Sequence, residues 1–353
     1  MSRTRVAVLF GGKSVEREVS RISARTIATA LDPAKYEVIP IAVSEGGRFL
    51  PPAESAALLS TGTVPARFRA DEAAGTALVP SEIAPGRVDV VFPIIHGTTG
   101  EDGALQGFLE TLGVPYVGAG VAASAVGMDK GVFKALLRDA GVPTPRAVVL
   151  RRPGDTSLAA ALPLPLFVKP SNGGSSVGVT KVKRREDLSG AVELAFRYDE
   201  RVLVEEGIDA RELECAVLGN EDPRASIPGE IVPGHEFYDY DDKYRDDKAR
   251  LLIPADVAPE VAETTRRLAV EVFLLCGASG MARVDFFLER GSGRVLVSEI
   301  NTLPGFTAIS MYPKLWEASG LALPRLLDEL VRLALARHER RGRLLTKPPA
   351  ELA

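Results

Sequence analysis

Hydrophobic and polar residues alternate along the first third of the chain in a way that predicts strands followed by helices. Residues 5–10 (RVAVLF) form an apolar run that predicts a strand, and residues 14–32 have the spacing of a helix. Further strands are predicted at 36–44 and 87–96, and an amphipathic helix at 101–112. Strands that alternate with helices and short glycine turns predict a parallel sheet covered on both faces.

The middle of the chain changes pattern twice. Residues 45–86 are rich in Pro, Ala, Ser and Gly and predict a surface insertion with weak structure. A helix is predicted at 128–141, closed by Gly141. After it come short strands around a glycine-rich turn and a helix near 187–198, which together predict a small α+β domain.

The last third predicts another unit with a hairpin at its centre. A strand is predicted at 211–219, a helix near 259–276, and a long amphipathic helix near the end. Residues 281–301 read as two strands joined by Gly-Ser-Gly, which is a strong hairpin signal. The predicted domains are therefore 1–127, 128–208 and 209–353.

Composition excludes several classes of protein. The chain has 353 residues, 25% of them charged, and a net charge of −4, which gives no electrostatic reason to expect nucleic acid or membrane partners. No stretch approaches the ~18–20 apolar residues of a membrane-spanning helix. The first apolar run is too short for a signal peptide. Cys215 and Cys276 lie in apolar contexts and are expected to be reduced core residues, which favours a cytoplasmic protein.

Three glycine-containing segments are candidates for phosphate binding. Residues 10–14 (FGGKS) resemble the tail of a phosphate loop, but the full pattern needs glycine where Ala7 stands, so that interpretation fails. Residues 118–123 (GAGVAA) match the dinucleotide fingerprint loosely, without a clean strand–helix–strand context, and indicate nicotinamide binding only weakly.

The third segment, residues 166–179 (LFVKPSNGGSSVGV), is more informative. Lys169 ends an apolar strand, and a Gly/Ser-rich turn follows in which the backbone is free to approach phosphate oxygens. Ser175 and Ser176 add hydroxyl donors. The alternative interpretation is a flexible hairpin with an exposed lysine.

The hairpin at 281–301 carries three oxygen ligands. Asp285 lies on its first strand, while Glu299 and Asn301 lie two positions apart on the second, so they share one face. Carboxylate and amide oxygens favour Mg²⁺ or Mn²⁺ that bridges to phosphates. The alternative interpretation is a set of polar residues on a solvated sheet face.

Residues 235–244 (HEFYDYDDKY) follow neither the strand nor the helix period. Three tyrosines and four acidic residues gather here around Lys243. On local grounds this segment is an exposed acidic loop.

Seven ordered motifs resemble the D-alanine–D-alanine ligases of the ATP-grasp superfamily over essentially the whole chain. The matching segments are GGKSVEREVS (11–20), HGTTGEDG (96–103), MDK (128–130), VKPSNGGSSVGV (168–179), FYDYDDKY (237–244), ARVDFFL (282–288) and SEINTLPGFT (298–307). The resemblance implies an α/β and α+β protein with the ATP-grasp fold: an N-terminal parallel-sheet α/β domain, a small central domain and a C-terminal domain. It also implies ATP-dependent joining of two D-alanines through D-alanyl phosphate, for peptidoglycan precursors.

The resemblance also implies roles for individual residues. Those expected at the nucleotide are Lys130, Lys169, Ser175, Ser176, Glu205 and Glu212. Two Mg²⁺ ions, with Mn²⁺ as an alternative, are expected at Asp285, Glu299 and Asn301. Residues expected to act in catalysis are Glu16, Ser175, Tyr244, Arg283 and Gly305, and those expected at the substrates are His96, Lys243, Ser310 and Met311.

The same resemblance suggests a homodimer and a lid formed by residues 235–244, with Tyr244 directed toward Ser175. A ligase that uses D-lactate or D-serine as second substrate is the alternative within the family. Two alternatives from other classes are a non-catalytic nucleotide-binding protein and a nicotinamide oxidoreductase. At 205–207 the chain has Glu-Glu-Gly, where relatives often carry a lysine and an aromatic residue after the glutamate.

Overall fold

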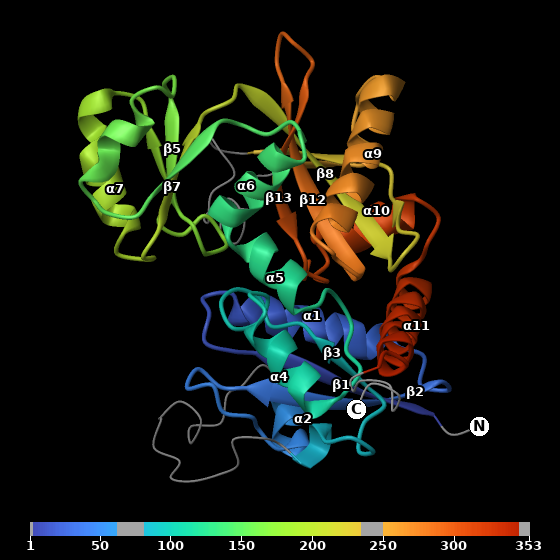
Figure 1. The fold of residues 1–353 in the computed structure, drawn as a ribbon. Helices are drawn as coiled ribbons and strands as arrows, with labels where there is room; N and C mark the ends of the chain where they lie inside the picture. The colour runs from blue at the N-terminus through green and yellow to red at the C-terminus, as the bar shows by residue number, and fades with distance from the viewer. Residues whose placement is uncertain (1–2, 62–80, 234–249, 346–353) are drawn as a thin grey trace, which may run out of the picture.

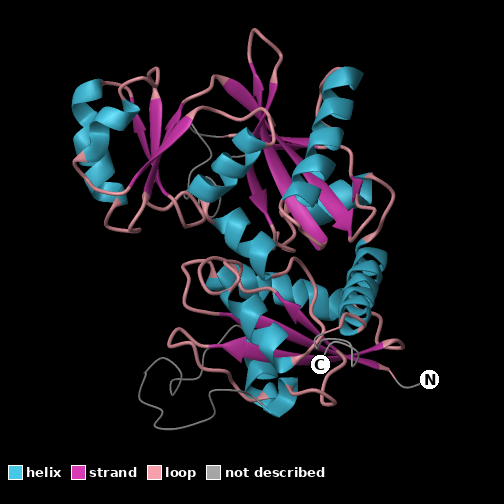
Figure 2. Ribbon diagram, in the orientation of Figure 1, coloured by secondary structure: helices cyan, strands magenta, loops and turns pink. Residues whose placement is uncertain are grey.

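The protein is built around three β-sheets, each with its own helices. The structure, a computed structural model, describes residues 3–61, 81–233 and 250–345. In Figure 1 the N-terminal sheet lies at the bottom, the middle sheet at the upper left and the C-terminal sheet at the upper right. Figure 2 shows the strands of these sheets gathered in three separate groups, with helices around each.

The N-terminal sheet is parallel, as its sequence pattern predicts. Strand β1 (Thr4–Gly11) lies between β2 (Tyr36–Val43) and β3 (Val90–Pro93) and pairs in parallel with both. Helices α1 (Arg17–Ala30) and α4 (Ala104–Leu112) follow along the chain.

The side chains of β1 alternate between the two faces of this sheet, and each face is covered by its own core. Val8 and Phe10 pack in a core with residues of α1 and α11 (Leu323–Gly342). Ala7 and Leu9 point the other way and pack with Leu105 and Leu109 of α4.

The segment 45–86 has more structure than its composition predicts. Residues 52–61 form helix α2 (Pro52–Thr61), which packs against β2. Leu58 and Leu59 of α2 are buried in the core of the N-terminal sheet, and Ile83 is fully buried in the short helix η1 (Ser81–Ile83). The prediction of weak structure was wrong for these parts, because burial of their apolar side chains in the cores of the N-terminal sheet outweighs the local composition.

Two helices lead from the N-terminal sheet to the rest of the protein. Helix α5 (Val121–Met128) is followed by α6 (Lys130–Asp139), so the predicted helix 128–141 begins at Lys130. Asp129 is the N-cap of α6, and its side chain accepts hydrogen bonds from Gly131 and Val132 at 3.0 and 3.1 Å. Such a cap satisfies backbone donors that the first helical turn leaves unpaired.

The middle sheet is small and antiparallel. Its strands run in the order β4 (Ala147–Leu150), β7 (Val202–Glu206), β5 (Leu166–Pro170), β6 (Thr180–Val182). Helix α7 (Leu188–Ala195) packs on β5. The short helices η2 (Asp155–Ala159) and η3 (Arg185–Asp187) complete this unit.

The C-terminal sheet is the largest of the three. Strand β8 (Ala210–Gly219) pairs with β12 (Gly280–Glu289), which pairs in turn with β13 (Val295–Asn301). The sheet is completed by β10 (Gly229–Val232), β11 (Arg250–Leu252) and β9 (Arg224–Ala225). Helices α9 (Pro259–Leu275) and α10 (Met311–Ala318) pack on β8.

Helix α6 belongs to the core of the C-terminal sheet. Phe133 and Leu137 of α6 are fully buried together with residues of β8, β12 and β13. The division of the chain after residues 127 and 208 stays a prediction, and this core extends into a helix that the prediction assigned to the middle unit. The site residues carried by α6 are therefore held rigidly against the C-terminal sheet.

Residues 118–123 lie at the contact between the N-terminal and C-terminal units. Arg337 of α11 donates hydrogen bonds to the carbonyls of Gly118 and Tyr116, the latter at 2.9 Å. A Cβ at Gly280 would lie 3.1 Å from the nitrogen of Gly118, so the two backbones are in close contact. The start of this glycine turn therefore serves packing between the two units.

Among the residues that the structure describes, no helix combines the length and the apolar character needed to cross a bilayer. Cys215 and Cys276 are free and buried, as predicted.

Candidate functional site

A cavity of about 830 Å³ lies where the three units meet, and each unit contributes to its lining. The N-terminal unit contributes Glu16 and His96, and the middle sheet contributes Lys169. The C-terminal sheet contributes Asp285 and Glu299. Most of the polar residues singled out in the sequence therefore face a common space, although they lie up to about three hundred positions apart.

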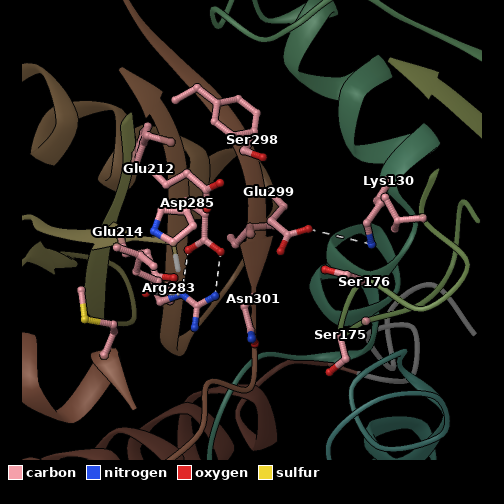
Figure 3. Close-up of a pocket in the computed structure, with 18 of the residues that line it drawn as sticks. Lys130, Ser175, Ser176, Glu212, Glu214, Arg283, Asp285, Ser298, Glu299 and Asn301 are labelled. Carbon is pink, nitrogen blue, oxygen red and sulfur yellow. Dashed lines mark hydrogen bonds and ion pairs between the residues drawn. The ribbon is translucent and has the colours of Figure 1, made fainter. Parts of the chain in front are cut away.

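The hairpin β12–β13 presents its acidic residues as predicted. Asp285 is the cross-strand partner of Glu299, and Arg283 is the partner of Asn301. A β-bulge follows Asp285, which is a common device beside functional sites because it redirects a side chain. Figure 3 shows Asp285, Glu299 and Asn301 on the same side of these strands, facing Lys130 and the two labelled serines across the cavity.

Arg283 is held between two carboxylates. Its guanidinium donates two hydrogen bonds of 2.7 Å to the oxygens of Asp285, and its Nε lies 3.0 Å from Oε2 of Glu214 (Figure 3). Burial lowers the pKa of Arg283, but Asp285 and Glu214 outweigh burial and hold the pKa well above its usual value. Glu214 was missed by the sequence analysis, because only its pairing opposite Asp285 on β8 places it here.

The oxygen atoms of the hairpin suit a hard divalent cation. Two carboxylates and the amide oxygen of Asn301, which also accepts a 2.9 Å hydrogen bond from Leu303, lie on neighbouring strands. Among the described residues no group of three His, Cys, Asp or Glu side chains is arranged to hold a metal ion. A cation at Asp285, Glu299 and Asn301 would thus need further oxygen ligands, and Mg²⁺ commonly takes these from phosphates and water.

Two lysines face the hairpin from the other side of the cavity. Lys130, at the start of α6, donates a 2.5 Å hydrogen bond to the carbonyl of Gly173 and lies 3.9 Å from Glu299. Lys169, at the end of β5, donates to Oε1 of Glu205 at 2.8 Å. Both were predicted as phosphate ligands, and both bring positive charge to the same wall of the cavity.

The glycine-rich turn after β5 adopts a strained backbone. Ser175 and Ser176 have φ of 52° and 58°, values that residues other than glycine seldom adopt. The Ser175 hydroxyl donates a hydrogen bond to the carboxylate of Glu16, which joins this turn to the N-terminal unit. Backbone strain of this kind is typical of loops that clamp a ligand.

His96 is buried beside the turn that follows β3. Only 5% of His96 is exposed, and its Nε2 has no hydrogen-bond partner among the described residues. Burial lowers the pKa of His96, so the imidazole is neutral at physiological pH. Ser14 donates a 2.6 Å hydrogen bond to the carbonyl of His96 and so positions it.

Glu101 is a partly buried acid in the turn after β3 that the sequence analysis did not single out. Its Oε1 accepts a 2.7 Å hydrogen bond from the amide of Gly97. Burial raises the pKa of Glu101 to about 8, and the nearby charge of Glu16 adds to the effect. Its position within the motif HGTTGEDG was the one signal available, and the motif does not reveal the burial.

The remaining predicted residues are placed as follows. Both oxygens of Glu205 face lysines, since Lys134 lies 2.7 Å from Oε2. Ser310 accepts a 2.9 Å hydrogen bond from the amide of Thr307 and precedes helix α10. Lining the cavity near these groups are Ser176, Glu212, Gly305 and Met311. Lys243, Tyr244 and the predicted lid at 235–244 lie outside the described residues.

Two family models cover most of the chain. The model described as "D-ala D-ala ligase N-terminus" matches residues 5–119, and the one described as "D-ala D-ala ligase C-terminus" matches residues 136–332. Between them they include every predicted site residue of the described part except Lys130.

Relatives and solved structures of the same family are similar to this chain over nearly its whole length. The D-alanine–D-alanine ligase A of Chromobacterium violaceum is 50% identical over 95% of this chain and 96% of its own length. The D-alanine–D-alanine ligase of Solibacter usitatus is 46% identical over 96% of this chain and 98% of its own length. The structure of the Coxiella burnetii D-alanine–D-alanine ligase superposes with a TM-score of 0.83 at 39% identity, covering 97% of each chain. The VanG D-Ala:D-Ser ligase of Enterococcus faecalis has the same TM-score at 34% identity, covering 94% of this chain and 100% of its own.

Proposed function

The chain belongs to the D-alanine–D-alanine ligase family, and from this membership we propose how its cavity carries out the reaction. The protein is an enzyme that joins two D-alanine molecules in an ATP-dependent reaction for peptidoglycan synthesis. Its fold is the ATP-grasp fold of its structural neighbours, so the predicted fold class is confirmed. The assignment of residues to steps is our proposal.

The reaction has two steps. The carboxylate of the first D-alanine attacks the γ-phosphorus of ATP, which gives D-alanyl phosphate and ADP. The amine of the second D-alanine, once deprotonated, attacks the activated carbonyl, and inorganic phosphate leaves. A free carboxylate is a poor acylating agent, so its phosphorylation must come first. Water has to be kept out, because acyl phosphates hydrolyse.

The N-terminal unit binds the first D-alanine. The carboxylate of Glu16 accepts a hydrogen bond from Ser175 and is oriented toward the cavity, where it binds the substrate ammonium. His96, buried and neutral, contributes a polar nitrogen next to Gly305. In this arrangement the substrate carboxylate points toward the lysine side of the cavity.

The triphosphate lies between the two walls. Lys130 and Lys169 neutralise its charge, and the turn carrying Ser175 and Ser176 supplies backbone and hydroxyl donors above it. Glu212 faces the same cavity and is assigned to the ribose. Glu205 acts on the nucleotide indirectly, by positioning the lysines that it binds.

Two Mg²⁺ ions are assigned to Asp285, Glu299 and Asn301, whose oxygens fit such a cation. When bound, the cations neutralise the charge that develops on the transferred phosphoryl group. Arg283, held in place by Asp285 and Glu214, lies beside this position with a permanent positive charge.

Arg283 and the amide of Gly305 stabilise the acyl phosphate and the oxyanion of the second step. Ser310 and Met311, at the start of α10, line the cavity and are assigned to the second D-alanine, as Lys243 was from the resemblance. Lys243 and Tyr244 lie outside the described residues, and so does the lid that we assign to residues 235–244.

One observation carries the proposal above all. Oxygen ligands from β12 and β13 face two lysines across a cavity bordered by the hydrogen bond between Ser175 of the middle unit and Glu16 of the N-terminal unit. A non-catalytic nucleotide-binding protein has no need of this whole set, because the reacting carboxylate, the phosphates and the cations each have their own ligands here.

The test is the release of phosphate from ATP. We expect release that depends on D-alanine and Mg²⁺ and is absent with L-alanine. The second substrate is tested by competition between D-alanine, D-serine and D-lactate across pH. Predominant D-alanyl-D-alanine supports the proposal, whereas predominant D-alanyl-D-lactate or D-alanyl-D-serine would contradict it. The homodimer rests on the family resemblance and the cytoplasmic location on the two reduced cysteines, and both stay predictions.

A further inference from the structure

Lys134 is a buried lysine for which the reaction gives no direct role. It lies on α6 one turn after Lys130, and only 5% of its side chain is exposed. Its ammonium lies 2.7 Å from Oε2 of Glu205 and donates a 2.7 Å hydrogen bond to the hydroxyl of Thr144. A buried ammonium is strongly unfavourable unless it is paired, so this side chain is held at Glu205 by its charge.

Glu205 is shared between two lysines. Its Oε2 faces Lys134, while its Oε1 accepts a 2.8 Å hydrogen bond from Lys169. Only 2% of the Glu205 side chain is exposed, compared with 16% for Lys169. Burial raises the pKa of Glu205, but the two ammonium groups outweigh burial and lower it to about 2, so the carboxylate stays charged.

The three side chains together carry a net charge of +1, from two ammonium groups and one carboxylate. Without Lys134, Glu205 and Lys169 would form a neutral pair. Lys169 would then be the sole partner of a buried carboxylate, and moving it away would leave that charge unpaired. With Lys134 present, Glu205 keeps a partner whichever way Lys169 turns.

We propose that Lys134 is a positioning residue for ATP binding, which holds Glu205 so that Lys169 can direct its charge to the phosphates. This inference rests on the proposed function, in which Lys169 binds the triphosphate. Lys134 itself is too deeply buried to reach the nucleotide. It sets the net charge of the three side chains and allows Lys169 to move away from Glu205.

A second contact connects Lys134 to the cation side of the cavity. The Lys134 ammonium lies 3.4 Å from the carbonyl of Val297 on β13, which also accepts a 2.8 Å hydrogen bond from Thr144. Val297 is two residues before Glu299 on the same strand. Lys134 therefore connects β7 of the middle sheet, which carries Glu205, to β13, which carries Glu299 and Asn301.

The test separates phosphate recognition from folding. Lys134→Gln removes the charge and retains a donor for Glu205. We expect the dissociation constant of ATP, measured by calorimetry, to rise by at least about tenfold, which is the usual loss when a charged hydrogen bond is removed. The dissociation constant of adenosine, which lacks phosphates, should change by less than about twofold. Equal weakening of ATP and adenosine would overturn the proposal, because a merely structural role affects both.

A double variant tests the mechanism directly. In Lys134→Gln with Glu205→Gln, Lys169 is released from the carboxylate and the net charge returns to +1. We expect the double variant to bind ATP at least about threefold more tightly than Lys134→Gln, a coupling that additive damage cannot produce. Equal or weaker binding by the double variant would contradict the proposed role.

Controls make each result decisive. Lys35 forms a surface ion pair of 2.7 Å with Asp328, and Lys35→Gln should leave ATP binding unchanged. If Lys134→Gln does not fold, Lys134→Met replaces it. If neither single variant folds, the double variant alone is measured. The proposal is then contradicted if the double variant binds ATP more than tenfold more weakly than wild type. If the wild-type protein binds no ATP, the proposed function itself fails. If the wild type binds ATP and Lys134→Gln binds it equally well, only the role of Lys134 is overturned.

Discussion

The hydroxyl of Ser175 donates a hydrogen bond to the carboxylate of Glu16, which lies 159 positions earlier in the chain. One residue belongs to a strained turn of the middle unit and the other precedes the first helix of the N-terminal unit. The bond therefore closes the phosphate turn against the part of the protein that binds the first substrate. It makes the orientation of Glu16 depend on the position of the turn.

Replacing Ser175 with alanine tests this connection. We expect Ser175→Ala to lower kcat/KM for D-alanine by about 10- to 100-fold, since it removes a hydrogen bond to a charged group that orients the substrate ligand. Steady-state kinetics at saturating ATP would measure the effect. Ser60→Ala, an exposed serine on α2, is the matched control. A loss seen equally in the control, or no loss at all, would speak against the connection.

Replacing Arg283 should make stability depend on the cation. Arg283→Met leaves the carboxylates of Asp285 and Glu214 facing each other without a counter-ion. Loss of one partner from a buried ion pair costs about 3–5 kcal/mol, so we expect a clear drop in the urea midpoint in the presence of a chelator. Mg²⁺ should restore part of it.

The control for this prediction is Arg294→Met on the same hairpin, whose ion pair with Glu289 is exposed. It should change neither the midpoint nor its response to Mg²⁺. If Arg283→Met were as stable as wild type without Mg²⁺, the electrostatic account of the site would be wrong.

Glu101 should give stability a distinctive dependence on pH. Its pKa is about 8 in the folded protein against an ordinary value of 4.5, so the folded state holds a proton that the unfolded chain releases. Stability is therefore lost as pH rises from about 4.5 to about 8, by at most about 5 kcal/mol. Glu101→Gln cannot lose that proton, so its stability relative to wild type should increase between pH 5 and pH 9.

Urea unfolding of both proteins across this range measures the difference. Glu193→Gln, at an exposed position on α7, is the control and should run parallel to wild type. Parallel curves for Glu101→Gln would show that Glu101 is ionised in the folded protein.

Removing the charge of Glu299 tests the cation site. We expect Glu299→Gln to lower kcat for D-alanine-dependent phosphate release by at least about tenfold and to raise the Mg²⁺ concentration needed for half-maximal activity, because a carboxylate ligand is replaced by an amide. A Mg²⁺ titration at constant ATP separates the two effects. Glu289→Gln, near the tip of the same hairpin, should behave as wild type; an unchanged Mg²⁺ requirement in Glu299→Gln would refute the assignment.

Much of the fold followed from local patterns. The parallel strands, the antiparallel hairpin and the long final helix were predicted from apolar periods and glycine turns, because these record which face of an element is buried. The hairpin placed Asp285 opposite Glu299 correctly for the same reason. The main error, α2 in 45–86, arose where burial against the N-terminal sheet stabilises a helix of weak local pattern.

By itself, the sequence determined the family and the identity of the polar residues around the cavity, since ordered motifs and strand alternation depend only on neighbours along the chain. The tertiary structure decided which charges face one another. The raised pKa of Glu101, the pairing of Glu214 with Arg283 and the sharing of Glu205 by Lys134 and Lys169 each require elements from separate parts of the chain. Burial and charge pairing act through space, and for that reason no local pattern contains them.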